Sequence, residues 1–205
     1  IGDSLMVMWG MPTPLKNPCE LACQTAIAVR NASNGLRDEW AQQKAPLKFN
    51  TRIGLHYGEA IVGNVGAADR FNYTMVGDTI NVASRLEGAN KTYKTNIIVS
   101  DAILKQLEHE NASHRFAFRM IGEVTMKGKS KSTLIYELYD QCCSLRQPQI
   151  EALDAWNRVK KQAIDHGNRA AFEQIEAESE ELRMHPLLIQ LKQELETSAQ
   201  STHRT

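Results

Sequence analysis

Residues 71–87 read Phe-Asn-Tyr-Thr-Met-Val-Gly-Asp-Thr-Ile-Asn-Val-Ala-Ser-Arg-Leu-Glu, a pattern that predicts a short strand, a turn and a helix. Aromatic and β-branched residues in the first six positions favour an extended chain, and Gly77 interrupts it. The helix is expected to begin near Asp78. Asp78 or Thr79 can cap it, because their side chains accept hydrogen bonds from the unpaired N–H groups of a first turn. We expect the rest of the chain to be arranged around this unit.

Two polar side chains share one face of the predicted helix. Asn81 and Arg85 are four residues apart and therefore lie about 6 Å from each other. Arginine offers a planar fork of donors and stays ionised, so the pair suits a substrate whose oxygens gain negative charge during reaction. The spacing alone also fits an exposed helix face on which both side chains are simply hydrated.

Three motifs resemble the class III nucleotidyl cyclase catalytic domain, and they stand in that family's order. They are IGDSLMVMWG at 1–10, RIGLHYG at 52–58 and VGDTINVASRLE at 76–87. The resemblance covers roughly residues 1–140. It implies a ferredoxin-like core with extra hairpins. It also implies an adenylate cyclase that converts ATP to 3′,5′-cyclic AMP and pyrophosphate in intracellular signal transduction.

The resemblance also assigns roles to single residues. Asn81 would orient the ribose, and Arg85 would stabilise the charge that develops on the α-phosphate. Asp3 would be one of two aspartates that hold two Mg²⁺ or Mn²⁺ ions. Lys127, in the Met-Lys-Gly-Lys motif, would contact the terminal phosphates. Apart from the resemblance, Asp3 is an ordinary turn residue and Lys127 belongs to a basic turn that favours solubility.

Thr74 bears on the choice of base. It stands seven residues before Asn81, where many adenylyl cyclases of the family have an aspartate that accepts from the adenine amino group. A hydroxyl can accept the same hydrogen bond, and threonine here resembles a bacterial subgroup that responds to bicarbonate. Guanylyl cyclases tend to have cysteine at this position, so Thr74 favours ATP. The alternatives are a guanylate cyclase, an inactive cyclase-homology domain that dimerises or senses, and a plain ferredoxin-like binding module.

His56 follows Arg-Ile-Gly-Leu on a predicted strand and invites assignment as a general base. A histidine on a strand is more often a hydrogen-bonded core group, so we assign it no catalytic role.

Composition restricts the partners. The 205 residues contain 24 Lys plus Arg and 24 Asp plus Glu, so no overall field favours nucleic acid or an anionic membrane. No apolar run approaches the roughly 20 residues that a membrane span needs. The four cysteines lack zinc-site spacing, which indicates free thiols in a reducing compartment. We expect a cytoplasmic protein, or the cytosolic part of a membrane-anchored one. The resemblance to the cyclases implies ATP and a second cyclase subunit as partners.

The order of elements predicts an α+β fold with a mostly antiparallel sheet and covering helices, followed by a helical C-terminal appendage. The expected elements are a strand at 4–9, a helix at 19–43, a hairpin of strands 47–56 and 59–65, a strand at 96–99, a helix from Ser100 or Asp101, and strands at 115–126 and 132–139. Along the helix at 19–43 a stripe should face the sheet, formed by Ala22, Ala26, Val29, Ser33, Leu36 and Trp40.

Two domains are expected, a catalytic domain at 1–140 and a helical appendage at 148–199. The appendage should break at 166–168 and 185–186, and it reads as either a docking element or a packing tail. The chain begins at Ile1 within a predicted strand hairpin, so we expect the catalytic domain to lack its first strand and helices. The resemblance implies that this strand would carry the second metal aspartate, so the isolated chain should be inactive. It also implies that the parent is a homodimer with composite sites.

Overall fold

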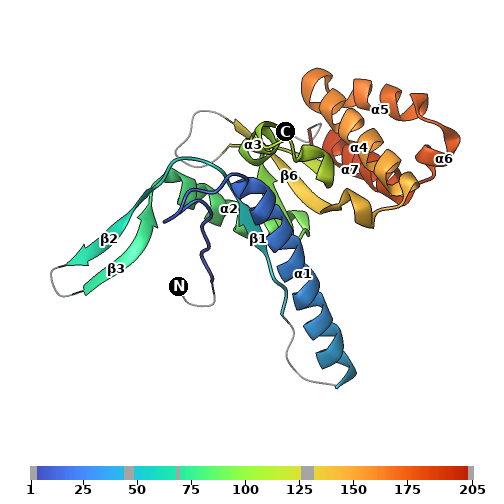
Figure 1. Cartoon of the computed structure of the whole chain (residues 1–205). Coiled ribbons are helices and arrows are strands. Elements are labelled where there is room, and N and C mark those ends of the chain that lie inside the picture. Colours follow the sequence, from blue (N-terminus) through green and yellow to red (C-terminus); the bar gives the residue numbers. More distant parts are fainter. Residues whose placement is uncertain (1–3, 44–48, 68–69, 126–131, 203–205) are drawn as a thin grey trace. The chain divides into compact units, whose positions relative to one another are not determined.

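The computed structural model describes residues 4–43, 49–67, 70–125 and 132–202 (Figure 1). Contacts between residues divide the chain into two compact units, residues 1–114 and 115–205. The described elements confirm the α+β class and the helical C-terminal region.

The first unit contains three long helices and two strand pairs. In chain order its elements are α1 (Pro18–Gln42), β1 (Ile53–Leu55), β2 (Ile61–Ala67), β3 (Arg70–Val76), α2 (Asp78–Tyr93), β4 (Ile97–Ser100) and α3 (Asp101–His109). Strand β1 runs parallel to β4, with Ile53 opposite Ile97. Strands β2 and β3 form an antiparallel hairpin, with Ile61 opposite Val76.

The predicted hairpin of strands 47–56 and 59–65 is wrong. Strand β1 instead pairs with β4, and β2 pairs with the strand that follows it. Alternation of apolar and polar residues indicates a strand, but it does not identify the strand's partner. A short, partly buried strand such as β1, packed beneath a helix, fits a parallel pair.

The predicted strand at 4–9 is also not observed. Residues 4–8 pair with no strand of the described chain, and Leu5 is 88% exposed. An extended apolar segment becomes a strand only where a neighbour bonds its backbone N–H and C=O groups.

Helix α1 is buried along its first half only. Cys19, Ala22, Cys23 and Ala26 lie in the core, which confirms the beginning of the predicted stripe. Val29 and Leu36 are 43% and 46% exposed, so the second half of the stripe does not face a sheet.

The start of α1 is fixed by a carboxylate. Glu110, just after α3, accepts from the backbone N–H groups of Cys19 and Glu20 at 3.1 and 2.9 Å. These donors have no partner inside the helix, and a negative charge there is favourable.

The second unit combines a strand pair with four helices. Its elements are β5 (Phe116–Thr125), β6 (Ser132–Gln141), a 3₁₀ turn (Cys142–Ser144), α4 (Gln147–His166), α5 (Asn168–Ala177), α6 (Glu180–Arg183) and α7 (Pro186–Thr202). Two breaks lie where predicted, at Gly167 with φ +85° and before Pro186. A further break between Ala177 and Glu180, with Ser179 as the N-cap of α6, was not predicted. Their core consists of Trp156, Val159, Ala171, Ile175, Leu191 and Leu195.

This second unit groups β5 and β6 with the C-terminal helices. The sequence-based boundary near residue 140 stays a prediction.

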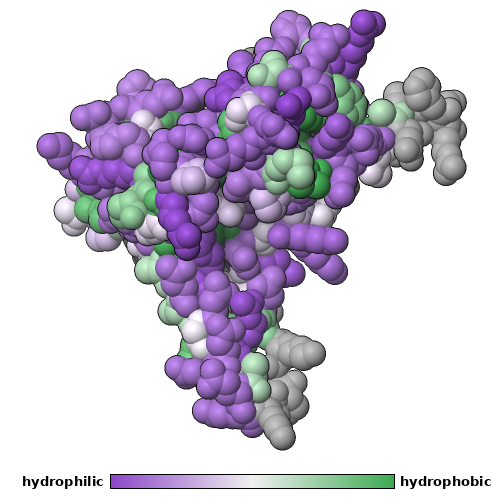
Figure 2. Space-filling model, turned by 90° about the vertical axis from the view of Figure 1, so that its right-hand side faces the viewer, coloured by the Kyte–Doolittle hydropathy of each residue, from purple (hydrophilic) through white to green (hydrophobic). Residues whose placement is uncertain are grey.

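None of the helices in the described part of the chain combines the length and the apolar composition needed to cross a bilayer. The face drawn in Figure 2 is mostly hydrophilic, with apolar side chains in small patches.

Candidate functional site

Helix α2 lies unusually close to strand β1, and a glycine permits that approach. A Cβ placed on Gly54 would meet the carbonyl oxygen of Ala83 at 2.2 Å and the backbone nitrogen of Glu87 at 2.4 Å. Real Cβ atoms do not come this close to backbone atoms, so a side chain at this position would push the helix away. The glycine of the Arg-Ile-Gly-Leu motif therefore sets the distance between α2 and the strand.

A buried amide fixes the helix along its axis. Asn90 is 1% exposed, and its Nδ2 donates to the carbonyl oxygen of Ile53 at 2.9 Å. The hydroxyl of Thr95 donates to Asn90 Oδ1 at 2.8 Å. At the surface, Arg52 Nε lies 2.7 Å from Glu87 Oε1. Asn90 was missed by the sequence reasoning, because an isolated asparagine near a helix end gives no signal for a long-range bond.

The first turn of α2 differs from the prediction. The N-cap residue is Gly77, with φ +144°, rather than Asp78 or Thr79. The Thr79 hydroxyl donates instead to the carbonyl oxygen of Glu59, just before β2. Gly77 adopts a backbone conformation that other residues rarely adopt, and this lets the chain turn sharply from β3 into the helix.

The two faces of α2 have different surroundings. Val82 and Leu86 are each 1% exposed and face the core, whereas Asn81 and Arg85 are exposed. The structure thus places the predicted pair on one outward face of a helix whose inner face is fixed to β1. Thr74 is half-buried on β3, opposite Gly63 and three residues before the turn at Gly77.

Asp3 and Lys127 lie outside the described residues. Within the described part of the chain, no group of three or more His, Cys, Asp and Glu residues is arranged to hold a metal ion. The described residues therefore supply no metal-ligand set of their own.

His56 has a local partner. Its Nδ1 lies 2.7 Å from the Ser100 hydroxyl, and the ring is half-buried between β1 and the N-cap of α3. This contact gives the ring a structural hydrogen-bond partner, and the absence of a catalytic role for His56 stays a prediction.

The two cysteines of α1, Cys19 and Cys23, are poorly suited to act as nucleophiles. Burial, with the negative charge of Glu110 as a second cause, raises the pKa of Cys19 to about 12. Burial raises the pKa of Cys23 as well. Both thiols therefore stay protonated near neutral pH, which makes them poor nucleophiles.

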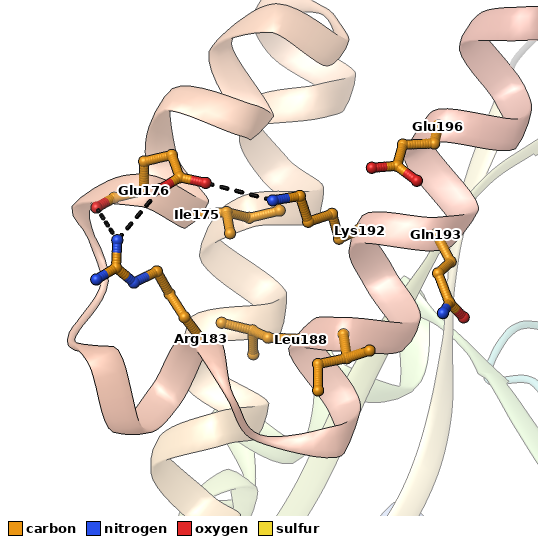
Figure 3. A pocket seen from close by; sticks show the side chains of 8 residues that line it. Ile175, Glu176, Arg183, Leu188, Lys192, Gln193 and Glu196 are labelled. Carbon is orange, nitrogen blue, oxygen red and sulfur yellow. Dashed lines mark hydrogen bonds and ion pairs between the residues drawn. The ribbon is translucent and has the colours of Figure 1, made fainter.

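A cavity of about 270 Å³ lies among α5, α6 and α7 (Figure 3). Glu176 accepts from Arg183 at 3.2 Å and binds Lys192 at 3.4 Å, while Ile175 and Leu188 form apolar walls. One carboxylate thus balances part of both cationic charges. No residue predicted for the site lines this cavity.

Comparisons with known proteins agree with the motifs. Residues 1–139 match the family model described as the adenylate and guanylate cyclase catalytic domain. The chain is 40% identical over 137 residues to adenylate cyclase 1 of Rhizobium meliloti (strain 1021), which covers 67% of this chain and 20% of the relative. It is 31% identical over 142 residues to the adenylate cyclase of Anabaena cylindrica, a match that covers 67% of this chain and 27% of that relative. The chain thus spans about a fifth to a quarter of the length of these two relatives.

Solved structures of cyclases are also similar to this chain. The adenylyl cyclase CyaB from P. aeruginosa is similar with a TM-score of 0.56 at 28% identity, covering 67% of this chain and 68% of that one. The guanylyl cyclase Cya2 is similar with a TM-score of 0.51 at 25% identity, covering 65% of this chain and 64% of that one.

Proposed function

This chain belongs to the class III adenylate and guanylate cyclase catalytic-domain family, and from that premise we propose that it is the catalytic domain of an adenylate cyclase acting in signal transduction. The observation that carries the proposal is the exposed Asn81 and Arg85 pair on α2. Gly54 and Asn90 hold that helix against β1. A preorganised pair of this kind suits a transition state that gains charge on phosphate oxygens.

In the proposed reaction the 3′-hydroxyl oxygen of ATP attacks the α-phosphorus and gives up its proton to solvent water. A new phosphorus–oxygen bond forms, the bond to the bridging oxygen breaks, and pyrophosphate leaves with the electron pair. Arg85 stabilises the charge on the α-phosphate oxygens, and Asn81 orients the ribose for in-line attack. Both side chains act most strongly in the transition state, so they should contribute to kcat more than to KM.

Three further assignments rest on the sequence motifs. Thr74 is proposed to accept from the adenine amino group and Lys127 to contact the terminal phosphates. Asp3 is proposed as one ligand of two Mg²⁺ or Mn²⁺ ions, since the family generally uses two metal ions. Such ions supply charge neutralisation on the triphosphate and a more nucleophilic 3′-hydroxyl.

A guanylate cyclase is the second candidate, because the chain is similar to the guanylyl cyclase Cya2. Thr74 argues for ATP, since a hydroxyl can accept a hydrogen bond from the amino group of adenine.

The proposed partner is a second cyclase subunit, with Asp3 from one chain and Arg85 from the other meeting in each site. Mixing full-length Asp3→Ala and Arg85→Ala subunits should restore one working site per heterodimer. A mixture that stays as inactive as either variant, with heterodimers demonstrated, would exclude composite sites.

The function is tested by incubating the full-length protein with ATP or GTP and Mn²⁺ and identifying the product by chromatography. We expect cyclic AMP and pyrophosphate from ATP. The Asn81→Ala variant should lose activity, whereas Ser84→Ala, an exposed position on the same helix, should keep it. Preferential cyclisation of GTP would favour the second candidate. Absence of either product would support an inactive homology domain.

A further inference from the structure

The first turn of α2 carries Asn81, and it begins without a side-chain cap. Its N-cap residue is Gly77, which has no side chain that could accept from the N–H groups of the turn. Those groups have no partner inside the helix, and helix ends fray unless something holds them. The contacts of Gly54 and Asn90 fix α2 from Ala83 onwards. The turn that carries Asn81 therefore depends on a different contact.

Thr79 provides that contact from within the first turn. Its hydroxyl donates to the carbonyl oxygen of Glu59, two residues before β2 begins. Ile61 and Val76 lie opposite each other at the end of the β2–β3 ladder. The bond thus joins the two chain segments that leave this end of the hairpin, and it closes the turn from β3 into α2.

Two glycines make room for the bond. A Cβ on Gly58 would meet the Thr79 hydroxyl oxygen at 2.8 Å, closer than real Cβ atoms come. A Cβ on Gly77 would lie 3.7 Å from the Cα of Ala60 and 3.8 Å from the Glu59 carbonyl oxygen. The turn therefore lies close against residues 58–60. Gly58 is the last residue of the Arg-Ile-Gly-Leu-His-Tyr-Gly motif, and this close approach gives that glycine a physical reason.

Thr79 stands between two residues of the proposed site. It follows Thr74, the proposed base contact, by five residues and precedes Asn81, the proposed ribose contact, by two. A shift of the first turn would therefore change the separation of the two contacts. Alignment of a reacting hydroxyl is sensitive to such shifts, since about 1 Å can cost on the order of 10² in rate. A bond that fixes this turn can affect turnover without touching the nucleotide.

We propose that Thr79 is a positioning residue for the reaction: by bonding Glu59 it holds the first turn of α2 and so orients Asn81 toward the ribose. The proposal rests on the proposed function. It assigns separate supports to the two polar residues of the outward face, because Arg85 lies on the later turns that pack against β1.

The test compares two substitutions of Thr79 in the full-length protein. Thr79→Val is nearly isosteric and removes the hydroxyl donor, so we expect kcat for cyclic AMP formation to fall about tenfold with KM changed by less than about twofold. Thr79→Ser keeps the donor and should retain kcat within about twofold. Thr25→Val is the matched control, because the Thr25 hydroxyl donates to a carbonyl of its own helix, that of Leu21 at 2.7 Å. It should behave as the wild type.

Double mutants identify the residue through which Thr79 acts. In an Asn81→Ala background Thr79→Val should alter kcat by less than about twofold, because the group that it positions is already gone. In an Arg85→Ala background it should keep its effect of about tenfold. Gly58→Ala should reproduce the loss of kcat, and adding Thr79→Val to it should cost little more, since both changes remove the same bond.

An unchanged kcat in Thr79→Val, or an equal loss in Thr79→Ser, would overturn the proposal. A full loss in the Asn81→Ala background would overturn it as well, because the hydroxyl would then act on the fold as a whole. If Thr79→Val fails to fold, Gly58→Ala takes its place in the same backgrounds.

Hydrogen exchange of residues 77–82 separates failure of this proposal from failure of the proposed function. Faster exchange in Thr79→Val than in the wild type supports the hold on the first turn, whether or not the protein cyclises ATP. Unchanged exchange refutes that hold. A wild-type protein that forms no cyclic nucleotide refutes the proposed function instead.

Discussion

Helix α2 lies against strand β1 and helix α4 against strand β5, and each helix uses an asparagine amide to bond the backbone of that strand. Asn90 of α2 donates to Ile53, and Asn157 of α4 bonds Phe118 and Met120. The space between helix and strand is filled differently. At α2 a missing side chain, that of Gly54, lets two backbones approach, whereas at α4 the large ring of Trp156 occupies the contact. Adding atoms should therefore destabilise the contact between α2 and β1, whereas removing atoms should destabilise the contact between α4 and β5.

The largest expected loss of stability is at the contact between α4 and β5. Trp156→Ala should lower the free energy of unfolding by about 3–5 kcal/mol, because it removes a buried ring and leaves the Met120 carbonyl without its indole donor. Trp156→Phe should cost less, since it keeps much of the ring volume and loses the hydrogen bond. Urea unfolding of both variants beside Lys161→Ala, an exposed ion-pair position on the same helix, gives these values. A loss below about 1 kcal/mol for Trp156→Ala would mean that this contact is not tightly packed.

At the contact between α2 and β1, the addition of one methyl group should destabilise the protein. Gly54→Ala should cost about 1–3 kcal/mol of stability, because its Cβ would overlap the backbone of α2. The displaced helix should also lower turnover, since a shift of about 1 Å can cost on the order of 10² in rate.

Gly88 of the same helix is the matched control, because a Cβ there meets nothing within 4 Å. Gly88→Ala should stabilise the protein by about 0.5–1 kcal/mol through helix propensity. A Gly54→Ala variant as stable as the wild type or as Gly88→Ala would contradict the close approach of α2 to β1.

The smallest effect concerns the cysteines and appears only at alkaline pH. Burial raises the pKa of Cys19 from its ordinary value of 9.0 to about 12. The unfolded chain therefore loses this proton at lower pH than the folded chain does. The stability that Cys19 contributes is present below pH 9 and is lost as the pH rises through 12.

Chemical unfolding between pH 8 and 11 should therefore show a shallower decline in stability for Cys19→Ala than for the wild type. Cys143→Ala, at an exposed thiol, should follow the wild-type curve. Parallel curves for all three proteins would contradict the burial argument.

The sequence indicated elements well where the signal was local. The turn at Gly77, the helix with Asn81 and Arg85, and the helix breaks near Gly167 and Pro186 all follow from residues close together in the chain.

Pairings between distant residues could not be predicted in this way. The partner of β1 lies more than 40 residues away, and alternation alone suggested an adjacent strand. Likewise, the bonds from Trp156 and Asn157 to β5 span 36 to 39 residues and leave no periodic pattern. The Gly54 contact is visible only once α2 lies on the strand.

We propose that the outward face of α2 performs the chemistry, while its inward face holds the helix in place. Steady-state kinetics of Arg85→Ala in the full-length protein test it most directly, with Lys91→Ala, another exposed cation on α2, as the control. We expect kcat for cyclic AMP formation to fall by about 10²–10³, with little change in KM or melting temperature, because the charge stabilised by Arg85 develops in the transition state. Lys91→Ala should behave as the wild type. An Arg85→Ala enzyme that keeps its full kcat would contradict the account.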